Sequence, residues 1–194
     1  LNALKDAGKT PEEIDMIIVA TVTPDSAFPS TACIVQKNIG AFNACAFDLG
    51  AACTGFMYGL TIAEQFIKTG FYKNILVIGA ETLSTILDYT DRNTCVLFGD
   101  GAGAAIVSIV DKGKGIISSY LGADGRGGEL LLVPAGGSRY SATTETVNDR
   151  MHFIKMSGSE VFKFAIKIMG EAAEKDLKTA RLTREDIDFL IPHQ

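Results

Sequence analysis

The chain alternates between short continuous apolar runs and longer stretches in which apolar residues recur with helical spacing. Between residues 54 and 68, apolar side chains return at intervals of three and four, which places them on one face of a helix. Residues 75–79 are apolar at successive positions, as is typical of a strand buried on both faces of a parallel sheet. This alternation predicts an α/β fold, in which right-handed crossovers connect the strands of a layered structure.

Other segments follow one of the same two patterns. We predict strands over 17–22, 46–49, 104–110, 116–121 and 130–133, and helices over 30–39 and 157–178. Ser30 is a suitable N-cap for the first of these helices. The remainder of 122–149 is rich in glycine and then polar, which indicates a loop.

One local pattern occurs twice. Residues 10–18 read TPEEIDMII and residues 183–191 read TREDIDFLI, each with a threonine that can cap an acidic turn, then Ile-Asp and an apolar strand. Such caps are common, so a shared local device is one explanation. We favour a duplication that gives two similar α/β halves around a pseudo-twofold axis. We therefore expect an N-terminal half over 1–150 and the beginning of a second half over 151–194.

Composition restricts the class of protein. The 194 residues are 47% hydrophobic and 21% charged, which is enough for a sizeable core. The net charge of −5 argues against a general nucleic-acid binder. No apolar run approaches the ~20 residues of a membrane span, so we expect no membrane association.

The chain starts at Leu1 within a helical pattern, and we expect its N-terminus to be cut. We expect a cytoplasmic protein, unless a targeting segment precedes Leu1.

The cysteines and histidines do not form a metal-binding pattern. None of the four cysteines belongs to a CxxC pair and there are only two histidines, so we expect no metal site and no disulfide framework. Cys33, Cys45 and Cys95 are expected to be structural, and His152 structural or on the surface.

Cys53 is the candidate nucleophile. It lies in the run DLGAACTGF, where an apolar strand ends, small residues form a turn and a helix begins. The N-terminus of a helix carries a partial positive charge that favours a thiolate, and the small neighbours allow a substrate to approach. A buried structural cysteine is the alternative interpretation.

His193 follows the predicted strand 189–191 and Pro192, so it lies at a strand end in the second half, as Cys53 does in the first. Two halves related by a pseudo-twofold axis would bring these strand ends together. A histidine there can donate a hydrogen bond to a thioester oxygen or transfer a proton. The alternative is a loop histidine without a catalytic role.

The glycine-rich run Phe98 to Ala105 does not have the spacing of a dinucleotide fingerprint, and a strand is predicted after it. Close backbone packing beside a pocket explains it better.

Four motifs in order along the chain resemble β-ketoacyl-acyl-carrier-protein synthase III, a condensing enzyme of the thiolase superfamily. They are AACTGF around Cys53, LFGDGAGAA at 97–105, MSGSEVFK at 156–163 and IPHQ at 191–194. The resemblance implies a thiolase-like fold with duplicated α/β halves in an α-β-α-β-α arrangement, of which the second half is incomplete here.

The resemblance also implies a reaction. Cys53 would accept an acyl group from acyl-CoA, and His193 would assist the decarboxylation of malonyl-acyl-carrier protein and the condensation that starts type II fatty-acid synthesis. The oxyanion hole would include the backbone N–H of Cys53. No cofactor is implied, because the CoA thioester is a substrate.

Further residues acquire roles from the resemblance. Arg92 would lie near the CoA adenine, and Phe28 would close the acyl pocket across the interface of a homodimer. The pantetheine tunnel would be lined by Phe98, Met156, Gly158, Ser159 and Phe162. Ser159 replaces an asparagine of some family members. Carrier proteins are acidic, so Lys155, Lys163 and Lys167 are candidates for the docking surface.

The third catalytic residue of the family, an asparagine, and a glycine of the oxyanion hole would follow Gln194, and the aromatic and arginine clamp for CoA would precede Leu1. We therefore expect residues 1–194 alone not to condense substrates.

Alternatives to a priming enzyme of fatty-acid synthesis are a secondary-metabolite or quinolone-type ketosynthase with the same Cys/His chemistry, a non-catalytic partner subunit, and an acyl-CoA binding module. The sequence does not define the length or branching of the primer.

Overall fold

The computed structural model describes residues 1–193. The chain forms two compact units, which are described separately. The first comprises residues 1–81 and 101–117, and the second comprises residues 82–100 and 118–194. These units do not test the division into duplicated halves at residue 150, which stays a prediction.

The first unit is built on a four-stranded sheet. Its strands are β1 (Met16–Ala20), β2 (Cys45–Leu49), β3 (Asn74–Thr82) and β4 (Asp100–Ser108), in the order β2-β1-β3-β4. β1 pairs in parallel with both β2 and β3, and all five of its residues are buried. The predicted strands 17–22, 46–49 and 75–79 are therefore confirmed, with boundaries shifted by a few residues.

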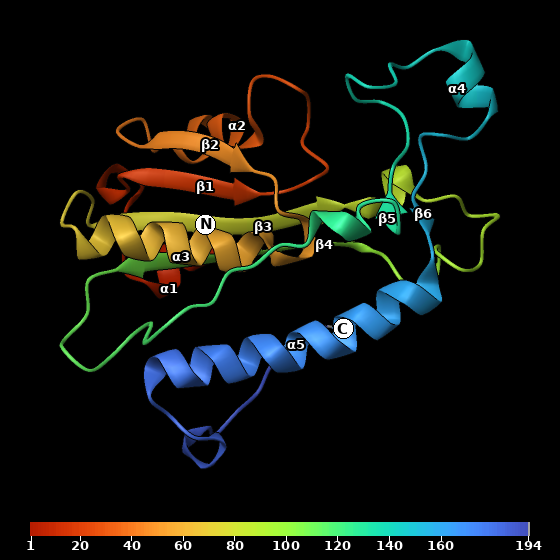
Figure 1. Cartoon of the computed structure of the whole chain (residues 1–194). Helices are drawn as coiled ribbons and strands as arrows, with labels where there is room; N and C mark the ends of the chain where they lie inside the picture. Colours follow the sequence, from red (N-terminus) through yellow and green to blue (C-terminus); the bar gives the residue numbers. More distant parts are fainter. Residues whose placement is uncertain (194) are drawn as a thin grey trace. The chain divides into compact units, whose positions relative to one another are not determined.

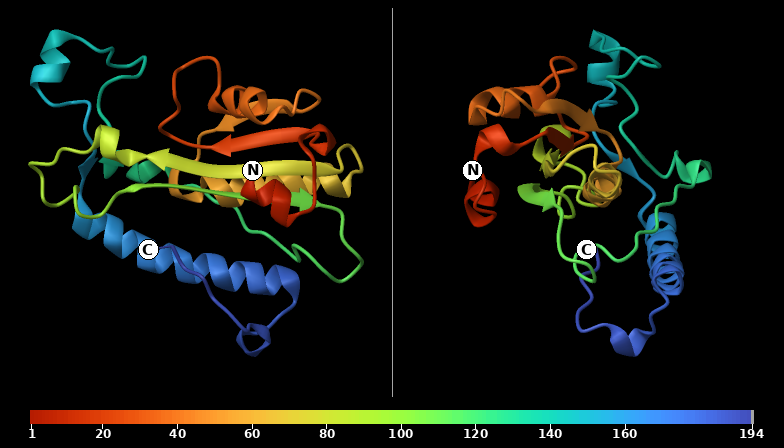
Figure 2. Two further views of the ribbon diagram at one scale, coloured as in Figure 1. Left: turned by 180° about the vertical axis from the view of Figure 1, so that it is seen from behind. Right: turned by 90° about the vertical axis from the view of Figure 1, so that its left-hand side faces the viewer.

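Helices cover both faces of this sheet (Figures 1 and 2). α1 (Asn2–Asp6) and α2 (Thr31–Ile39) pack on one face, where Leu4 and Ala32 meet Ile17 and Val19. α3 (Gly55–Lys68) packs on the other face, where its Ala63 joins a core cluster with alternate residues of β1 and β3. Successive strand residues point to opposite faces, so a strand covered on both sides is apolar throughout. The predicted helices 30–39 and 54–68 are confirmed, and Ser30 caps α2 by accepting the Cys33 N–H.

The last part of this unit differs from the prediction. The glycine-rich run does not precede a strand but forms the first half of β4, which runs opposite to β3 (Figure 1). The predicted strand 116–121 is absent. The two glycines at 113 and 115 adopt positive φ angles of 90° and 84°, and no strand pairs with the residues that follow. An apolar run without a neighbouring strand has no partners for its backbone groups.

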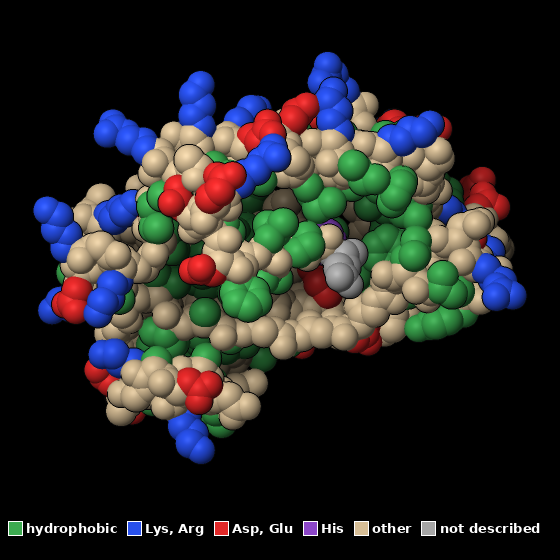
Figure 3. Space-filling model, turned by 90° about the horizontal axis from the view of Figure 1, so that it is seen from below, with side chains coloured by type: hydrophobic (Ala, Val, Ile, Leu, Met, Phe, Trp, Pro, Cys, Tyr) green, Lys and Arg blue, Asp and Glu red, His purple; other side chains and the backbone are tan. Residues whose placement is uncertain are grey.

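The second unit contains β5 (Leu131–Leu132), α4 (Thr144–Asn148), β6 (Lys155–Met156) and α5 (Gly158–Ala180). β5 pairs antiparallel with β6. α5 agrees with the predicted helix 157–178. The loop predicted over 122–149 is wrong at α4, where Thr143 caps the helix by accepting the Thr146 N–H. Hydrophobic side chains are exposed at the surface, as a space-filling view shows (Figure 3).

The two copies of the repeat form the same local structure. A 3-10 turn at Pro11–Glu13 and another at Arg184–Asp186 each carry a capping box, based on Thr10 and Thr183. The strand predicted after the second copy is not formed, and Ile191 is 91% exposed. The equivalent strand of the first copy, β1, has a parallel neighbour on each side. Residues 189–191 have no such neighbour among the described residues.

No helix within residues 1–193 is both long enough and apolar enough to cross a membrane.

Candidate active site

Cys53 lies in a sharp connection between β2 and α3. β2 ends at Leu49, a 3-10 turn covers Ala52–Thr54, and α3 begins at Gly55. Ala52 has a φ of 45°, in the left-handed region that side chains other than glycine seldom adopt. The Cys53 side chain is exposed. A strained residue before an exposed nucleophile at a strand-to-helix turn is a feature that recurs at active sites.

The start of α3 is pressed against the sheet at this point. A Cβ atom placed on Gly55 would lie 2.9 Å from the Cβ of Ala20, the last residue of β1. Only glycine permits this approach, because real Cβ atoms do not come so close. The N–H groups of Thr54 and Gly55 donate to the carbonyl oxygens of Ala51 and Ala52. These bonds and the close packing of Gly55 fix the turn around Cys53 at the carboxyl end of the parallel strands.

Glu81 organises the same end of the sheet. Its Oε1 accepts the Val22 N–H at 3.0 Å, and its Oε2 accepts the Thr23 hydroxyl at 2.7 Å. The Thr21 hydroxyl accepts the Thr23 N–H at 3.0 Å. Glu81, near the end of β3, therefore fixes the chain where it leaves β1. Sequence reasoning missed this residue, because its hydrogen-bond partners lie 59 and 58 residues earlier in the chain.

Asp48, in β2, is a second carboxylate that sequence reasoning missed. Its two oxygens accept the N–H groups of Thr31 and Ala32, each at 2.8 Å, in the first turn of α2. A carboxylate at this position satisfies unpaired donors and lies favourably with respect to the helix dipole. Asp48 is five residues before Cys53, so the strand that leads to the nucleophile also anchors α2.

Phe28 lies in the loop between β1 and α2. Its side chain is 86% exposed, and the peptide bond between Phe28 and Pro29 is cis. The Ser26 hydroxyl lies 3.1 Å from the Phe28 carbonyl oxygen. Phe28 and Cys53 both belong to the first unit, and each follows the carboxyl end of a parallel strand.

The predicted tunnel residues of the second unit form one group. Met156 is half-buried at the end of β6, and Gly158, Ser159 and Phe162 lie in the first turns of α5. The Met156 Cε lies 3.5 Å from a Cβ placed on Gly158. Phe162 is 66% exposed. Gly158, Ser159 and Phe162 are therefore accessible, and their role in a tunnel stays a prediction.

Arg92 and Phe98 lie in the turns between β3 and β4. Arg92 is exposed, and the preceding Asp91 holds the turn by accepting the Asn93 N–H at 3.0 Å and the Thr94 hydroxyl at 3.1 Å. Phe98 is half-buried.

His193 is exposed and follows the unpaired segment 189–191. It belongs to the second unit, whereas Cys53 belongs to the first, so the pairing of the two side chains stays a prediction. His152 accepts or donates a hydrogen bond with the Thr146 hydroxyl at 2.9 Å, in keeping with the expected structural role.

The three candidate docking lysines differ in their surroundings. Lys155 is half-buried in β6, and Lys163 is exposed in the second turn of α5. Lys167 is also exposed, and its Nζ lies 3.8 Å from the Glu171 carboxylate. Of the two exposed lysines, Lys163 has no ion pair within 4.0 Å among the described residues, so it offers its charge to a partner most directly.

The other cysteines belong to other segments of the chain. Cys33 is exposed in α2, and Cys95 is half-buried. Cys45, at the start of β2, lies 3.5 Å from the Tyr72 hydroxyl, and this hydrogen bond raises the pKa of Tyr72. In the part of the chain that the structure describes, no three His, Cys, Asp or Glu side chains gather as a metal site requires.

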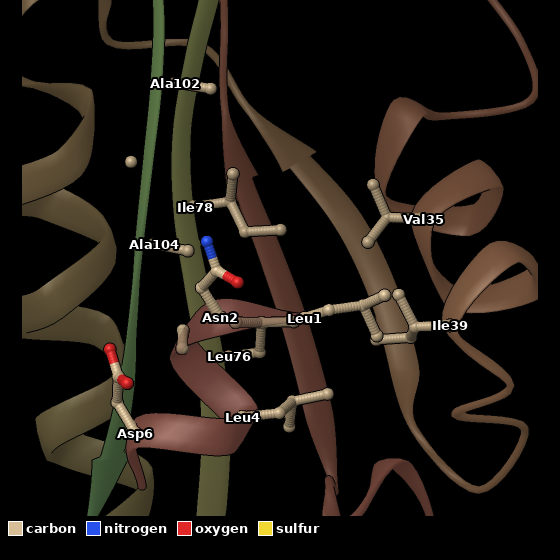
Figure 4. Close-up of a pocket in the computed structure, with 12 residues that line it drawn as sticks. Leu1, Asn2, Leu4, Asp6, Val35, Ile39, Leu76, Ile78, Ala102 and Ala104 are labelled. Atoms are coloured by element: carbon tan, nitrogen blue, oxygen red, sulfur yellow. The ribbon is translucent and has the colours of Figure 1, made fainter.

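A hollow in the first unit lies between α1, α2 and the sheet (Figure 4). Its walls include Leu4, Val35, Leu76 and Ile78, which are apolar. It contains none of the predicted site residues and no nucleophile. The turn of Cys53 is therefore the better candidate for an active site.

Comparisons with known proteins identify the family of this chain. A family model described as 3-oxoacyl-[acyl-carrier-protein] synthase III matches residues 47–125, which include Cys53. The β-ketoacyl-[acyl-carrier-protein] synthase III of Caldanaerobacter subterraneus is 64% identical over 192 residues, and that of Natranaerobius thermophilus is 65% identical over 195 residues. Each alignment covers 99% of this chain.

By sequence, the chain belongs to the β-ketoacyl-acyl-carrier-protein synthase III family. It spans 58% and 59% of the length of these two relatives. A solved synthase III from Aquifex aeolicus is 44% identical with a TM-score of 0.83, over 95% of this chain and 55% of that chain. The synthase III of Pseudomonas aeruginosa is 35% identical with a TM-score of 0.86, over 99% and 57%. The α/β, thiolase-like fold predicted from the sequence is confirmed.

Proposed function

We propose that the full-length protein is a condensing enzyme that primes type II fatty-acid synthesis. It takes an acyl group from acyl-CoA onto Cys53 and condenses it with malonyl-acyl-carrier protein to give a β-ketoacyl-acyl-carrier protein and CO2. The observation that carries this proposal is the exposed Cys53 at a strained strand-to-helix turn, within the region that the family model matches.

The chemistry follows from this geometry. The Cys53 thiolate attacks the thioester carbonyl of acyl-CoA, and the CoA thiolate leaves and takes up a proton. Malonyl-acyl-carrier protein then loses CO2, and the resulting carbanion attacks the acyl-cysteine carbonyl and expels the Cys53 thiolate. The Cys53 N–H donates to the oxygen on which charge develops, and such a donor is worth about 3 kcal/mol in other enzymes.

His193 assists the second step in this proposal. Its imidazole donates a hydrogen bond to the malonyl thioester oxygen as the carbanion forms. Met156, Gly158, Ser159, Phe162 and Phe98 line the passage for the pantetheine chain, and Arg92 contacts the adenine end of CoA. The protein needs no cofactor and works in the cytoplasm.

The partners follow from the same proposal. Phe28 closes the acyl pocket of the partner subunit in a homodimer. The acidic carrier protein docks near Lys163, Lys155 and Lys167. The chain comprises an N-terminal half over 1–150 and the first part of a second half over 151–194.

Intact mass spectrometry tests the first step. The full-length protein is incubated with acetyl-CoA and longer acyl-CoAs, beside a Cys53→Ala variant and a Cys33→Ala variant. We expect a gain of one acyl group in the unchanged protein and in Cys33→Ala, since Cys33 is also exposed but lies in α2, away from the turn. The gain is absent in Cys53→Ala. Acylation that persists without Cys53 would contradict the proposal.

A related polyketide enzyme is the second candidate. The priming β-ketosynthase of the R1128 polyketide pathway is 34% identical with a TM-score of 0.82. The identities of 64% and 65% to the synthase III relatives favour the fatty-acid function. Reaction with carrier proteins of fatty-acid synthesis and of polyketide synthesis, measured side by side, separates the two.

A further inference from the structure

The loop that carries Phe28, residues 22–29, is held at both ends by carboxylates of the sheet. At its beginning Glu81 of β3 binds the Val22 N–H and the Thr23 hydroxyl. At its end Asp48 of β2 binds the Thr31 and Ala32 N–H groups. Hydrogen bonds to a charged acceptor are about twice as strong as those between neutral groups. Both ends of the loop are thus fixed to one sheet, by the two strands that flank β1.

The loop is also braced internally. The Asp25 N–H donates to the Thr31 hydroxyl at 3.1 Å. The Ser26 hydroxyl lies 3.1 Å from the Phe28 carbonyl oxygen and 3.3 Å from that of Pro29. These bonds restrict the backbone on both sides of Phe28. Since the Phe28 side chain is 86% exposed, this order contributes little to the packing of the ring within the first unit.

We propose that Glu81 and Asp48 are positioning residues that fix the Phe28 ring and thereby limit the length of the acyl primer. This inference rests on the function proposed above, in which Phe28 closes the acyl pocket. Neither carboxylate touches the substrate in this proposal. Glu81 acts through the start of the loop and Asp48 through the first turn of α2, where the loop ends. The loss of either should therefore alter primer selectivity more than the reactivity of Cys53.

Glu81 is the better residue to test, because Asp48 lies in the strand that leads to Cys53. Glutamine has the shape of glutamate but keeps one acceptor oxygen and places an NH2 group against the Val22 N–H or the Thr23 hydroxyl. A donor facing the Val22 N–H leaves both groups unsatisfied. The Glu81→Gln change therefore loosens the start of the loop while the side-chain volume stays the same.

Asp15 offers a matched control at the opposite end of the sheet. Its Oδ2 accepts the backbone N–H groups of Lys73 and Asn74 at 2.8 and 2.9 Å. Asp15→Asn makes the same chemical change at a carboxylate with two backbone donors, beside the amino end of β3. It should reduce stability without any effect on the Phe28 loop.

The measurement is kcat/KM of the full-length protein for acyl-CoAs of increasing length. One methylene in an apolar pocket changes kcat/KM by about 10- to 200-fold, so a displaced pocket wall should be readily detected. We expect Glu81→Gln to change the ratio of long to short primers by about tenfold, and Asp15→Asn to leave it within about twofold. Thr23→Val removes one donor and keeps Glu81, and should change the ratio in the same direction by less.

A double-mutant cycle with Phe28→Ala decides whether Glu81 acts through the ring. If it does, adding Glu81→Gln to Phe28→Ala produces no further change in the ratio of kcat/KM for long and short primers. The inference would be overturned if Glu81→Gln changed this ratio equally in the unchanged protein and in Phe28→Ala, or did not change it at all. In either case, acylation of Cys53 would still uphold the proposed function. If the unchanged protein is acylated by no acyl-CoA at all, the proposed function and this inference fall together.

Discussion

Gly59 of α3 faces Val77 of β3 with no space for a side chain, since a Cβ on Gly59 would lie 2.9 Å from the Val77 Cγ1. Val77 is completely buried in the middle of the sheet and cannot move aside. We expect Gly59→Ala to lower the free energy of unfolding by about 1–3 kcal/mol, as overpacking of a core does. Urea denaturation measures the change.

Gly170 in α5 is the matched control for this substitution. It is also a helical glycine, but a Cβ there would meet nothing within 4 Å. Gly170→Ala should therefore raise stability by up to ~1 kcal/mol, the usual difference in helix propensity. Equal effects at the two positions would show that α3 does not lie as close to β3 as described.

A second prediction concerns pH and the ion pair between Asp88 and Arg150. The Asp88 side chain is buried, and Arg150 donates to it through Nε at 2.7 Å and through Nη2. These bonds, and then those from Thr90, hold the pKa of Asp88 well below its ordinary value. The stabilisation is present above the unfolded-state pKa of about 3.9 and is lost as the pH falls through the folded-state value.

Arg150→Gln removes the cation of this pair. At pH 7 the urea concentration at the midpoint of unfolding should be lower for Arg150→Gln than for the unchanged protein. The difference between the two midpoints should be constant from pH 7 to 5 and become smaller below about pH 4. Arg126→Gln is the control, because Arg126 also pairs with a carboxylate and lowers the pKa of Asp124 to about 2, yet its side chain is 91% exposed. An exposed pair contributes little, so this midpoint should hardly change.

A third prediction concerns docking of the carrier protein. Reversing the charge at Lys163 should raise the KM for malonyl-acyl-carrier protein by up to about fivefold, since one surface charge pair contributes up to about 1 kcal/mol. The KM for acyl-CoA should not change. Steady-state kinetics at low ionic strength measures both.

Lys178→Glu is the control for Lys163→Glu. Lys178 is exposed on the same helix, and fifteen residues of helix place it about 22 Å away, beyond the Debye length of about 10 Å at 0.1 M salt. The same increase in KM for both variants would indicate a general charge effect and would remove Lys163 from the docking surface.

From the sequence we could predict elements with a strong local pattern of apolar or small residues. α3 was found because its apolar positions recur along 14 residues, and the turn at Cys53 because small residues separate it from β2. The strand at 116–121 was wrongly predicted, because an apolar run says nothing of whether a neighbouring strand is present to pair with it. α4 was missed because its stability comes from the Thr143 cap rather than from apolar spacing.

In the candidate site, too, residues with a strong local signal were predicted and residues that depend on distant partners were missed. Cys53 stands out in the sequence because its residue type and its neighbours carry the signal. Glu81 does not, because its partners are Val22 and Thr23, 59 and 58 residues earlier, and two of its bonds go to a backbone N–H that any residue supplies. Contacts between distant segments depend on the register of β1 against β3, which no local pattern specifies.

The last prediction concerns the residue before the nucleophile. Ala52 has a φ of 45°, which costs a non-glycine residue roughly 1–2 kcal/mol. Ala52→Gly should relieve this strain and retain acylation of Cys53, with a small net effect on stability because glycine also makes the unfolded chain more flexible.

Ala52→Val should shift the turn, since a β-branched residue strongly resists positive φ. We expect the rate of Cys53 acylation to fall at least about tenfold in Ala52→Val, by the reasoning that a small misplacement of a reacting group costs a hundredfold in other enzymes. Acylation by acyl-CoA, followed by intact mass over time, compares the two variants directly. Equal rates for valine and glycine would show that the conformation of this turn does not control the reactivity of Cys53.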